Sequence, residues 1–245
     1  MGFLGNFKGQ QALALHAKGR EADAIRLYAD ALKAGMDKPR LLLAYSVLLI
    51  RDGQYEAAKD LLIKTQKAPG INAAQKSQLF MNYAVCMFKT GELDKGLNLL
   101  EKQHIHQPCG LIYETLGYLY VEKYQLTAKP EDAGEDWEAG VRKAQAFLKE
   151  SVEYDDTDSI CLDNMGQFCY RVLGDKAQAK EWFVKAHEEK ENQIDTLWFL
   201  SRYDVEDGDT AAAIEKLEAA AAGRFSPLNY VTRDMVEAEI ARLKA

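Results

Sequence analysis

The chain has 245 residues, of which 47% are hydrophobic and 28% are charged, a composition that supports a continuous buried core rather than disorder. No apolar run reaches the roughly 20 residues that a membrane-spanning helix needs, and the N-terminus lacks the apolar run of a signal peptide. The net charge of −7 is uneven, because residues 1–110 carry 15 Lys and Arg against 10 Asp and Glu, whereas residues 111–245 carry 16 against 28.

The stretch Gly19–Met36 contains the first copy of a pattern that recurs along the chain. Ala24, Tyr28 and Ala31 fall at i, i+4 and i+7, which predicts a helix that buries one side. Gly19 precedes this helix at a position suited to a tight turn. The set recurs after 34 residues and then further along, at Gly53, Ala58 and Leu62; Gly91, Gly96 and Leu100; Gly174, Ala179 and Phe183; and Gly208, Ala213 and Leu217.

A second mark, a bulky residue followed by a small one, lies in the expected upstream helix of five units. A small residue there lets two helices approach closely while the large one fills the space beside it. The pairs are Tyr45-Ser46, Tyr83-Ala84, Leu116-Gly117, Met165-Gly166 and Leu200-Ser201. The two marks together resemble the tetratricopeptide repeat (TPR), a helix-turn-helix unit of 34 residues. This resemblance implies an all-α fold, a right-handed solenoid of stacked repeats.

The pattern predicts a single array, residues 1–245, that ends in a capping helix. Val231, Met235, Ala238 and Leu243 form the apolar side of that helix, which would shield the end of the repeat core. The six repeats are expected at about residues 5–38, 39–72, 77–109, 110–158, 159–193 and 194–227, and the capping helix at 228–245.

The first helix of repeat 1 is expected to be weak. Gly5 and Gly9 interrupt it, and each costs up to about 1 kcal/mol relative to Ala. Phe3, Leu4 and Phe7 would therefore lie on a segment that frays. They could cap the core of the first repeat, fold back into the groove, or reach a partner.

Histidines and cysteines invite a test for metal sites. His104, His106 and Cys109 lie within six residues, but Pro108 fits the end of a repeat helix and no fourth ligand is evident nearby. His187-Glu188 begins a sequence like HExxH, yet Glu191 stands where the second histidine is required. No metal or other cofactor is expected. The four cysteines, which are Cys86, Cys109, Cys161 and Cys169, lack the spacing of a disulfide framework and indicate a reducing, cytoplasmic protein.

Repeat 4 departs most from the pattern, since it carries about 15 extra residues between Gly117 and Ala144. Lys129-Pro130-Glu131-Asp132 is typical of a helix start, with proline in the first turn and acids near the N-terminus. The second helix of this repeat is expected to be two or three turns too long. Trp137 on it is a candidate secondary binding surface, and the alternative is a longer helix that covers a gap in the stack.

The resemblance implies a concave groove lined by the first helices of successive repeats. The inward face would be apolar in the N-terminal half and polar, aromatic and partly acidic further on. The candidate partner-binding residues are Leu43, Val47, Ile50, Met81, Val85, Phe88, Tyr118, Val121, Asp163, Gln167, Tyr170, Trp198 and Arg202.

These features favour a non-catalytic scaffold that binds a peptide or helix of a partner protein in the groove. The alternative is a self-associating structural protein whose groove is filled by another copy, as a homodimer, or by its own N-terminal segment. The charge asymmetry would orient a ligand or favour head-to-tail contacts between copies, unless it reflects only uneven solvation. Nucleic acid is not expected, because the acidic half would repel phosphates, and membrane insertion is not expected either. No catalytic grouping is evident, so an enzyme is not predicted.

Overall fold

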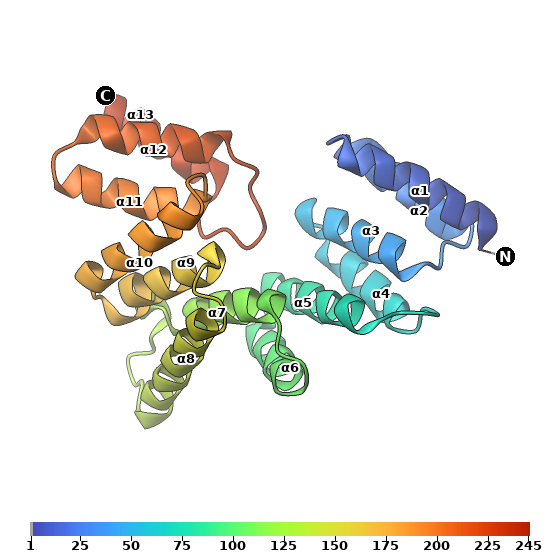
Figure 1. The fold of residues 1–245 in the computed structure, drawn as a ribbon, viewed down its shortest axis with the longest axis horizontal. Helices are drawn as coiled ribbons and strands as arrows, with labels where there is room; N and C mark the ends of the chain where they lie inside the picture. Colours follow the sequence, from blue (N-terminus) through green and yellow to red (C-terminus); the bar gives the residue numbers. More distant parts are fainter. Residues whose placement is uncertain (1) are drawn as a thin grey trace. The chain divides into compact units, whose positions relative to one another are not determined.

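The computed structural model of the protein describes residues 2–245, and these form helices with no strand among them (Figure 1). The chain groups into two compact units, Met1–Ile112 and Tyr113–Ala245, a division that the sequence analysis does not predict. We refer to them as unit 1 and unit 2. The boundary falls within one helix, α7.

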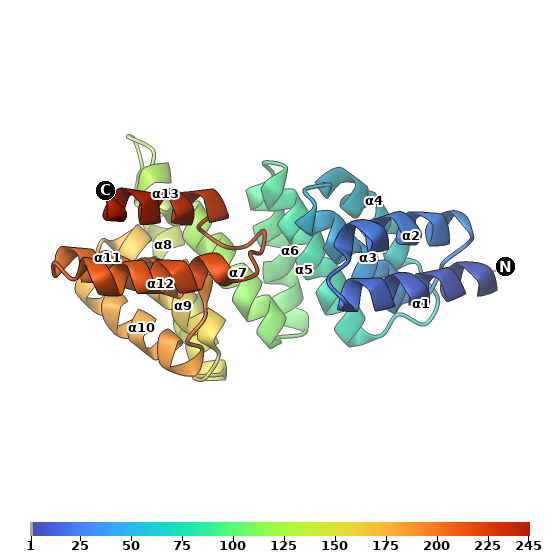
Figure 2. The same cartoon turned by 90° about the horizontal axis from the view of Figure 1, so that it is seen from above.

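Unit 1 consists of three helix pairs in chain order. Its first helices, α1, α3 and α5, are neighbours, and each packs against the second helix that follows it. Figure 2 shows α1 and α2 side by side. The bounds are α1 Phe3–Ala17, α2 Glu21–Lys33, α3 Pro39–Arg51, α4 Tyr55–Gln66, α5 Ala73–Lys89 and α6 Leu93–His106.

Unit 2 continues the alternation, with first helices α7, α9 and α11 and second helices α8, α10 and α12, and α13 lies against α12. Two short helical turns, η1 and η2, follow α7 and α9. The bounds are α7 Gly110–Tyr124, η1 Leu126–Ala128, α8 Glu135–Tyr154, α9 Ser159–Phe168, η2 Cys169–Leu173, α10 Lys176–Glu189, α11 Ile194–Glu206, α12 Thr210–Ala222 and α13 Arg233–Lys244.

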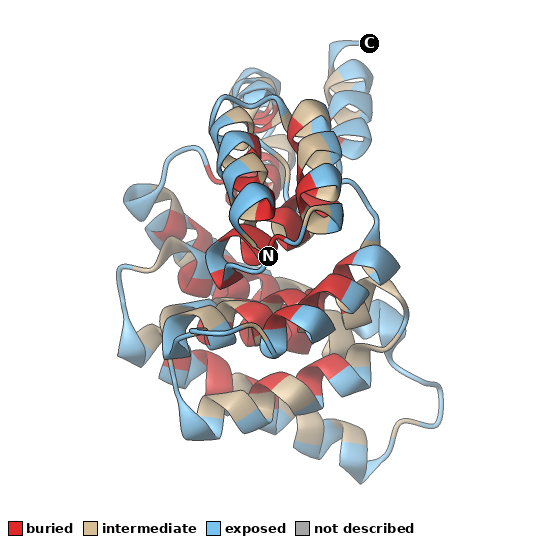
Figure 3. Ribbon diagram, turned by 90° about the vertical axis from the view of Figure 1, so that its right-hand side faces the viewer, coloured by how far each residue is buried: buried red, intermediate tan, exposed pale blue. Residues whose placement is uncertain are grey.

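The residues that mark the repeat in the sequence make the contacts between helices. Gly53 and Gly208 end their helices with φ of 75° and 81°, a conformation that a side chain disfavours. At Gly166 an added Cβ would lie 2.7 Å from the ring of Phe183, so α9 and α10 approach closely only because that position is small. Figure 3 shows the buried residues on the sides where helices meet.

Aromatic stacking fills the core of both units. Tyr28 and Tyr45 stack with centroids 5.2 Å apart in unit 1, and Phe183 and Phe199 stack at 4.7 Å in unit 2. Stacked pairs of this kind stabilise a fold by about 0.5–1.5 kcal/mol beyond their buried area.

The expectation of a weak first helix is wrong, because α1 is a continuous helix of 15 residues. Gly5 and Gly9 are buried, and a Cβ on Gly5 would lie 2.2 Å from the backbone nitrogen of Met36. The glycines therefore permit a close helix contact. Phe3, Leu4 and Phe7 neither cap the core nor fold back within unit 1, because they are 87%, 56% and 55% exposed.

Helix α8 begins later than predicted, at Glu135, and it has 20 residues where the other second helices have 12 to 14. Its first turns lie against the end of α7: Trp137 meets Tyr124 edge-on at 5.2 Å, and a Cβ on Gly140 would collide with that tyrosine ring. The extra length thus packs against α7.

The capping helix also begins later than predicted. Helix α13 starts at Arg233, and Thr232 caps it through a hydrogen bond from the Met235 amide. The preceding residues are not helical. They form the long loop between α12 and α13 (Figure 1).

Candidate interaction surfaces

In unit 1, the predicted groove residues fall into two groups on α3 and α5. Val47, Met81 and Phe88 are partly exposed and place apolar atoms at the surface of these two helices. The remaining three are buried and belong to the packing between helices: Leu43, Ile50 and Val85.

In unit 2, only two of the predicted groove residues are partly exposed, Tyr170 and Arg202. The others are buried, which the sequence analysis does not foresee for residues placed on a binding face. These are Tyr118, Val121, Asp163, Gln167 and Trp198.

A buried polar network accounts for part of this burial. Asp163 of α9 accepts hydrogen bonds from Gln167 Nε2 at 2.7 Å and from Thr196 Oγ1 of α11 at 2.6 Å. Arg171 donates to Gln167 Oε1 at 2.8 Å and pairs with Glu122 of α7 at 2.7 Å. These bonds connect α7, α9 and α11. They also give each buried polar side chain a partner, without which its burial would be costly.

The loop between α12 and α13 lies against the same face at α11. Asp195 of α11 accepts hydrogen bonds from Asn229 Nδ2 and the Tyr230 amide, both at 3.0 Å, and from the Val231 amide at 3.2 Å. The Tyr230 ring stacks on Phe199, with centroids 5.3 Å apart and planes 19° apart.

Arg171 lies on another side of the same tyrosine ring. Its guanidinium carbon is 4.0 Å from the Tyr230 centroid, a cation–π contact. Part of the first-helix face of unit 2, at α11 and Arg171, is therefore covered by a segment of the chain itself. We call residues 225–231 the covering segment.

Burial raises the pKa of three carboxyl groups in unit 2. Burial, with the nearby charge of Asp195, raises the pKa of Asp163 to about 7, and burial also raises the pKa of Asp195. The pKa of Glu114 on α7 is raised to about 7, mainly by burial and then by the charge of Asp158. Asp163 and Glu114 therefore hold protons near neutral pH that exposed carboxyls would have lost.

Arg202 lies at the edge of the covered face. Its guanidinium carbon is 3.8 Å from the Trp198 ring centroid, and it pairs with Glu239 of α13 at 2.6 Å. The side chain therefore joins α11 to the capping helix, although part of it remains exposed.

Two asparagines, Asn82 and Asn164, link each first helix to the one before it. Asn82 Nδ2 donates to Ser46 Oγ at 3.2 Å, and Asn164 Nδ2 donates to the carbonyl of Glu114 at 2.8 Å. Both side chains therefore serve helix packing.

Sequence reasoning missed four residues that shape the face of unit 2: Glu122, Arg171, Asp195 and Tyr230. Asp195 and Arg171 lie on or next to first helices near predicted groove positions, so a wider reading of the same face would have found them. Tyr230 carries no such signal, because the pattern places it in a helix.

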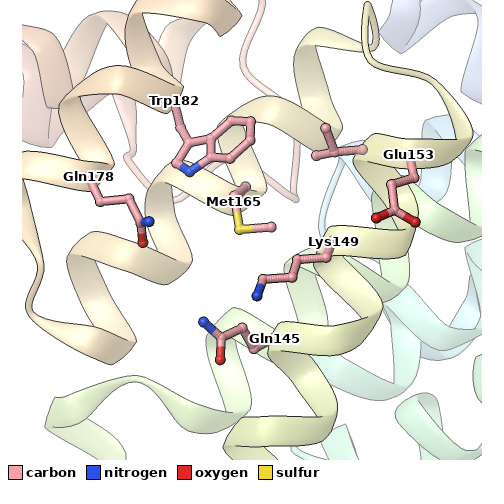
Figure 4. A pocket seen from close by; sticks show the side chains of 7 residues that line it. Gln145, Lys149, Glu153, Met165, Gln178 and Trp182 are labelled. Carbon is pink, nitrogen blue, oxygen red and sulfur yellow. The ribbon is translucent and has the colours of Figure 1, made fainter.

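A shallow cavity of about 210 Å³ lies between α8, α9 and α10, on the side of the second helices. Figure 4 shows Trp182 above Met165, with Lys149, Gln145 and Gln178 around the same space. This volume is below the roughly 300–1,000 Å³ of typical small-molecule sites. The cavity is therefore too small to indicate a ligand.

Within residues 2–245, no three His, Cys, Asp or Glu side chains come together as a metal site requires. No helix in that part of the chain is both long and apolar enough to cross a membrane. The four thiols are free, and Cys86, Cys161 and Cys169 are buried. Burial raises the pKa of Cys86 to about 12, so this thiol is protonated at neutral pH.

Comparison with solved structures identifies the architecture. The TPR protein TTC0263 of Thermus thermophilus superposes with a TM-score of 0.65 at 17% identity, covering 84% of this chain and 99% of that one. The fold is a TPR solenoid. PilW, a type IV pilus biogenesis factor, aligns with a TM-score of 0.62 at 15% identity, over 92% of this chain and 97% of its own.

A third similar structure is the human IFIT1 dimer with m7Gppp-AAAA, with a TM-score of 0.63 and 18% identity. The match covers 90% of this chain and 48% of that one. No protein-family model matches the sequence, and no curated protein does. These likenesses show the TPR fold.

Proposed function

We propose that the protein is a non-catalytic scaffold that binds a peptide or helix of a partner protein on the first-helix face of unit 1. The observation that carries this proposal is the partial exposure of Val47, Met81 and Phe88 on the neighbouring helices α3 and α5. Partly exposed apolar side chains above a rigid core are the usual anchors for an amphipathic segment.

Leu43, Ile50 and Val85 are buried on the same two helices and support this surface from below. Because these residues are packed between helices, a partner would gain apolar contact without first ordering the site, which lowers the entropic cost of binding. A transient complex of this kind has an affinity near micromolar, about −8 kcal/mol.

The test is photo-crosslinking from position 81 in the intact protein, followed by capture with a Val47→Glu, Met81→Glu double variant. The matched control is Ile105→Glu on α6, an apolar residue that is 77% exposed and lies on a second helix. A partner should be retained by the wild type and the control and lost by the double variant. If the folded double variant keeps every partner, this surface is not the binding site.

Self-association is a second candidate, and one observation favours it. Phe3, Leu4 and Phe7 form an exposed apolar ridge on α1, a helix that contains no Asp or Glu. Residues 1–110 have a net charge of +5 and residues 111–245 one of −12, so unit 1 of one copy would be attracted to unit 2 of another, and the ridge would add apolar contact.

A further inference from the structure

The loop between α12 and α13 is longer than the connection requires. The neighbouring repeats of unit 2 are joined by four residues between α8 and α9 (155–158) and by four between α10 and α11 (190–193). The equivalent connection before α13 has ten residues, 223–232. The additional residues allow the covering segment to reach the first-helix face.

The segment contacts this face as a bound peptide would. Its main-chain amides at Tyr230 and Val231 donate to the Asp195 carboxylate, and the Asn229 side chain adds a third bond. The Tyr230 ring supplies an aromatic anchor between Phe199 and Arg171. Main-chain bonds combined with one inserted aromatic side chain are a common mode of peptide recognition.

The receiving groups are held in place without the segment. Arg171 is fixed by Glu122 at 2.7 Å, by Gln167 at 2.8 Å and by Gln125 Oε1 at 2.9 Å. Phe199 stacks on Phe183 of α10 on its other side. If the segment leaves, the two groups that clamp the ring therefore keep their positions.

The segment itself is a compact turn. The Ser226 amide donates to Asn229 Oδ1 at 2.7 Å, and the Asn229 amide donates to the Ser226 carbonyl at 3.0 Å. Within the segment only Val231 is buried, and the Tyr230 side chain is partly exposed. Residues 225–230 are thus less buried than Val231, which together with the cap of α13 anchors the C-terminal end of the segment.

We propose that the covering segment is an internal ligand that occupies a peptide site on unit 2, and that a partner segment of similar chemistry binds there by displacing it. The partner would be an extended peptide with an aromatic residue, preceded by an amide or cationic side chain that can donate to Asp195. An acidic side chain at that position is disfavoured, because the Asp195 oxygens accept hydrogen bonds and an ionised carboxylate has none to donate. This site is separate from the surface proposed in unit 1 and does not depend on it.

The test uses the full chain with residues 225–230 replaced by alternating glycine and serine at the same length. Binding of a fluorescent peptide with the sequence of residues 224–232 is measured by anisotropy. The variant should bind this peptide at least about tenfold more tightly than the wild type does. Peptides with a scrambled sequence, or with alanine in place of Tyr230, should lose that affinity.

Two results would overturn the proposal: a folded linker variant that does not bind the peptide, or a wild type that binds it equally well. If the linker variant lacks a cooperative unfolding transition, the Tyr230→Ala chain replaces it, because it removes the ring and keeps the three bonds to Asp195. That chain should bind the peptide more tightly than the wild type, and equal or absent binding overturns the proposal.

Adding Val47→Glu and Met81→Glu should leave peptide binding unchanged, which separates this site from unit 1.

Discussion

At the scale of single residues, small side chains and buried carboxyls decide the packing. Gly5 is informative because its helix would be better formed in isolation with alanine, which has the higher helix propensity. In the protein the backbone of Gly35 and Met36 lies where a Cβ would be. Contact between helices thus outweighs the intrinsic preference.

Gly5→Ala should therefore lower the free energy of unfolding by about 1–3 kcal/mol, since backbone atoms cannot move aside as a flexible side chain can. Thermal unfolding followed by circular dichroism measures the loss. Gln10→Ala, at an exposed position of the same helix, is the control and should change little. An unchanged midpoint for Gly5→Ala would mean that α1 does not pack on residues 35 and 36.

Asp163 predicts a pH dependence with a definite sign. Its pKa is raised to about 7 in the folded protein from an ordinary 3.8. The folded state therefore keeps a proton that the unfolded state releases, and stability falls as the pH rises through the interval between these values, by at most about 1.4 kcal/mol per pH unit. Asp163→Asn should flatten this dependence and raise the midpoint at the alkaline end.

Unfolding midpoints measured in buffers from about pH 4 to about pH 8 span this interval and test the expectation. Glu114, whose pKa is also raised to about 7, contributes a slope of the same sign. Glu114→Gln is therefore the companion variant, and it should remove the part of the pH dependence that Asp163→Asn leaves. A slope in Asp163→Asn identical to that of the wild type would show that Asp163 is ionised in the folded protein.

At the scale of elements, the beginnings of two helices depend on contacts distant in sequence. Pro130 and the acids after it resemble a helix start, yet α8 begins at Glu135 where Trp137 can meet Tyr124. Helix α13 begins five residues after the expected Leu228 because Asp195 holds the preceding amides in an extended loop. Local propensity is weaker than either contact.

Trp137→Ala should loosen the first two turns of α8. Because the indole is only partly buried, we expect a local loss of roughly 1–2 kcal/mol rather than the 3–5 of a fully buried tryptophan. Hydrogen exchange should rise in residues 125–140 and stay constant in α10. Glu138→Ala, at an exposed neighbour, is the control, and equal exchange in both variants would rule out a role for the Trp137 contact.

At the scale of the whole molecule, the chain joins a basic unit to an acidic one, and the exposed ridge on α1 belongs to the basic unit. Opposite charges on the two units favour association between copies at low ionic strength, and salt screens that attraction. An apolar ridge would add a contribution that salt does not remove.

Sedimentation velocity over a range of concentrations tests self-association. If copies associate through the ridge, a Phe3→Ser, Phe7→Ser variant should remain monomeric where the wild type forms larger species, and salt should weaken the wild-type association. Ile105→Ser, another exposed apolar position, should behave as the wild type does. A wild type that is monomeric at every concentration and salt level would exclude this candidate function.

The TPR architecture was predictable because its signal is local and repeated. Residues such as Tyr28, Gly166 and Phe183 recur at a fixed period, and each contacts only the adjacent helices, so their spacing alone identifies the fold. The partly exposed Val47 and Met81 were predicted for the same reason. Their role in binding remains a prediction.

The state of the binding face could not be predicted in this way. Asp195 and Tyr230 are 35 residues apart, and nothing in the periodic pattern indicates that a loop after the last repeat lies over α11. The sequence by itself determined the repeat architecture and the small and aromatic positions that pack between neighbouring helices, because those preferences act between near neighbours. Only the tertiary structure decided that part of the face of unit 2 is covered, because that depends on where an irregular segment finds partners for its amides and its aromatic ring.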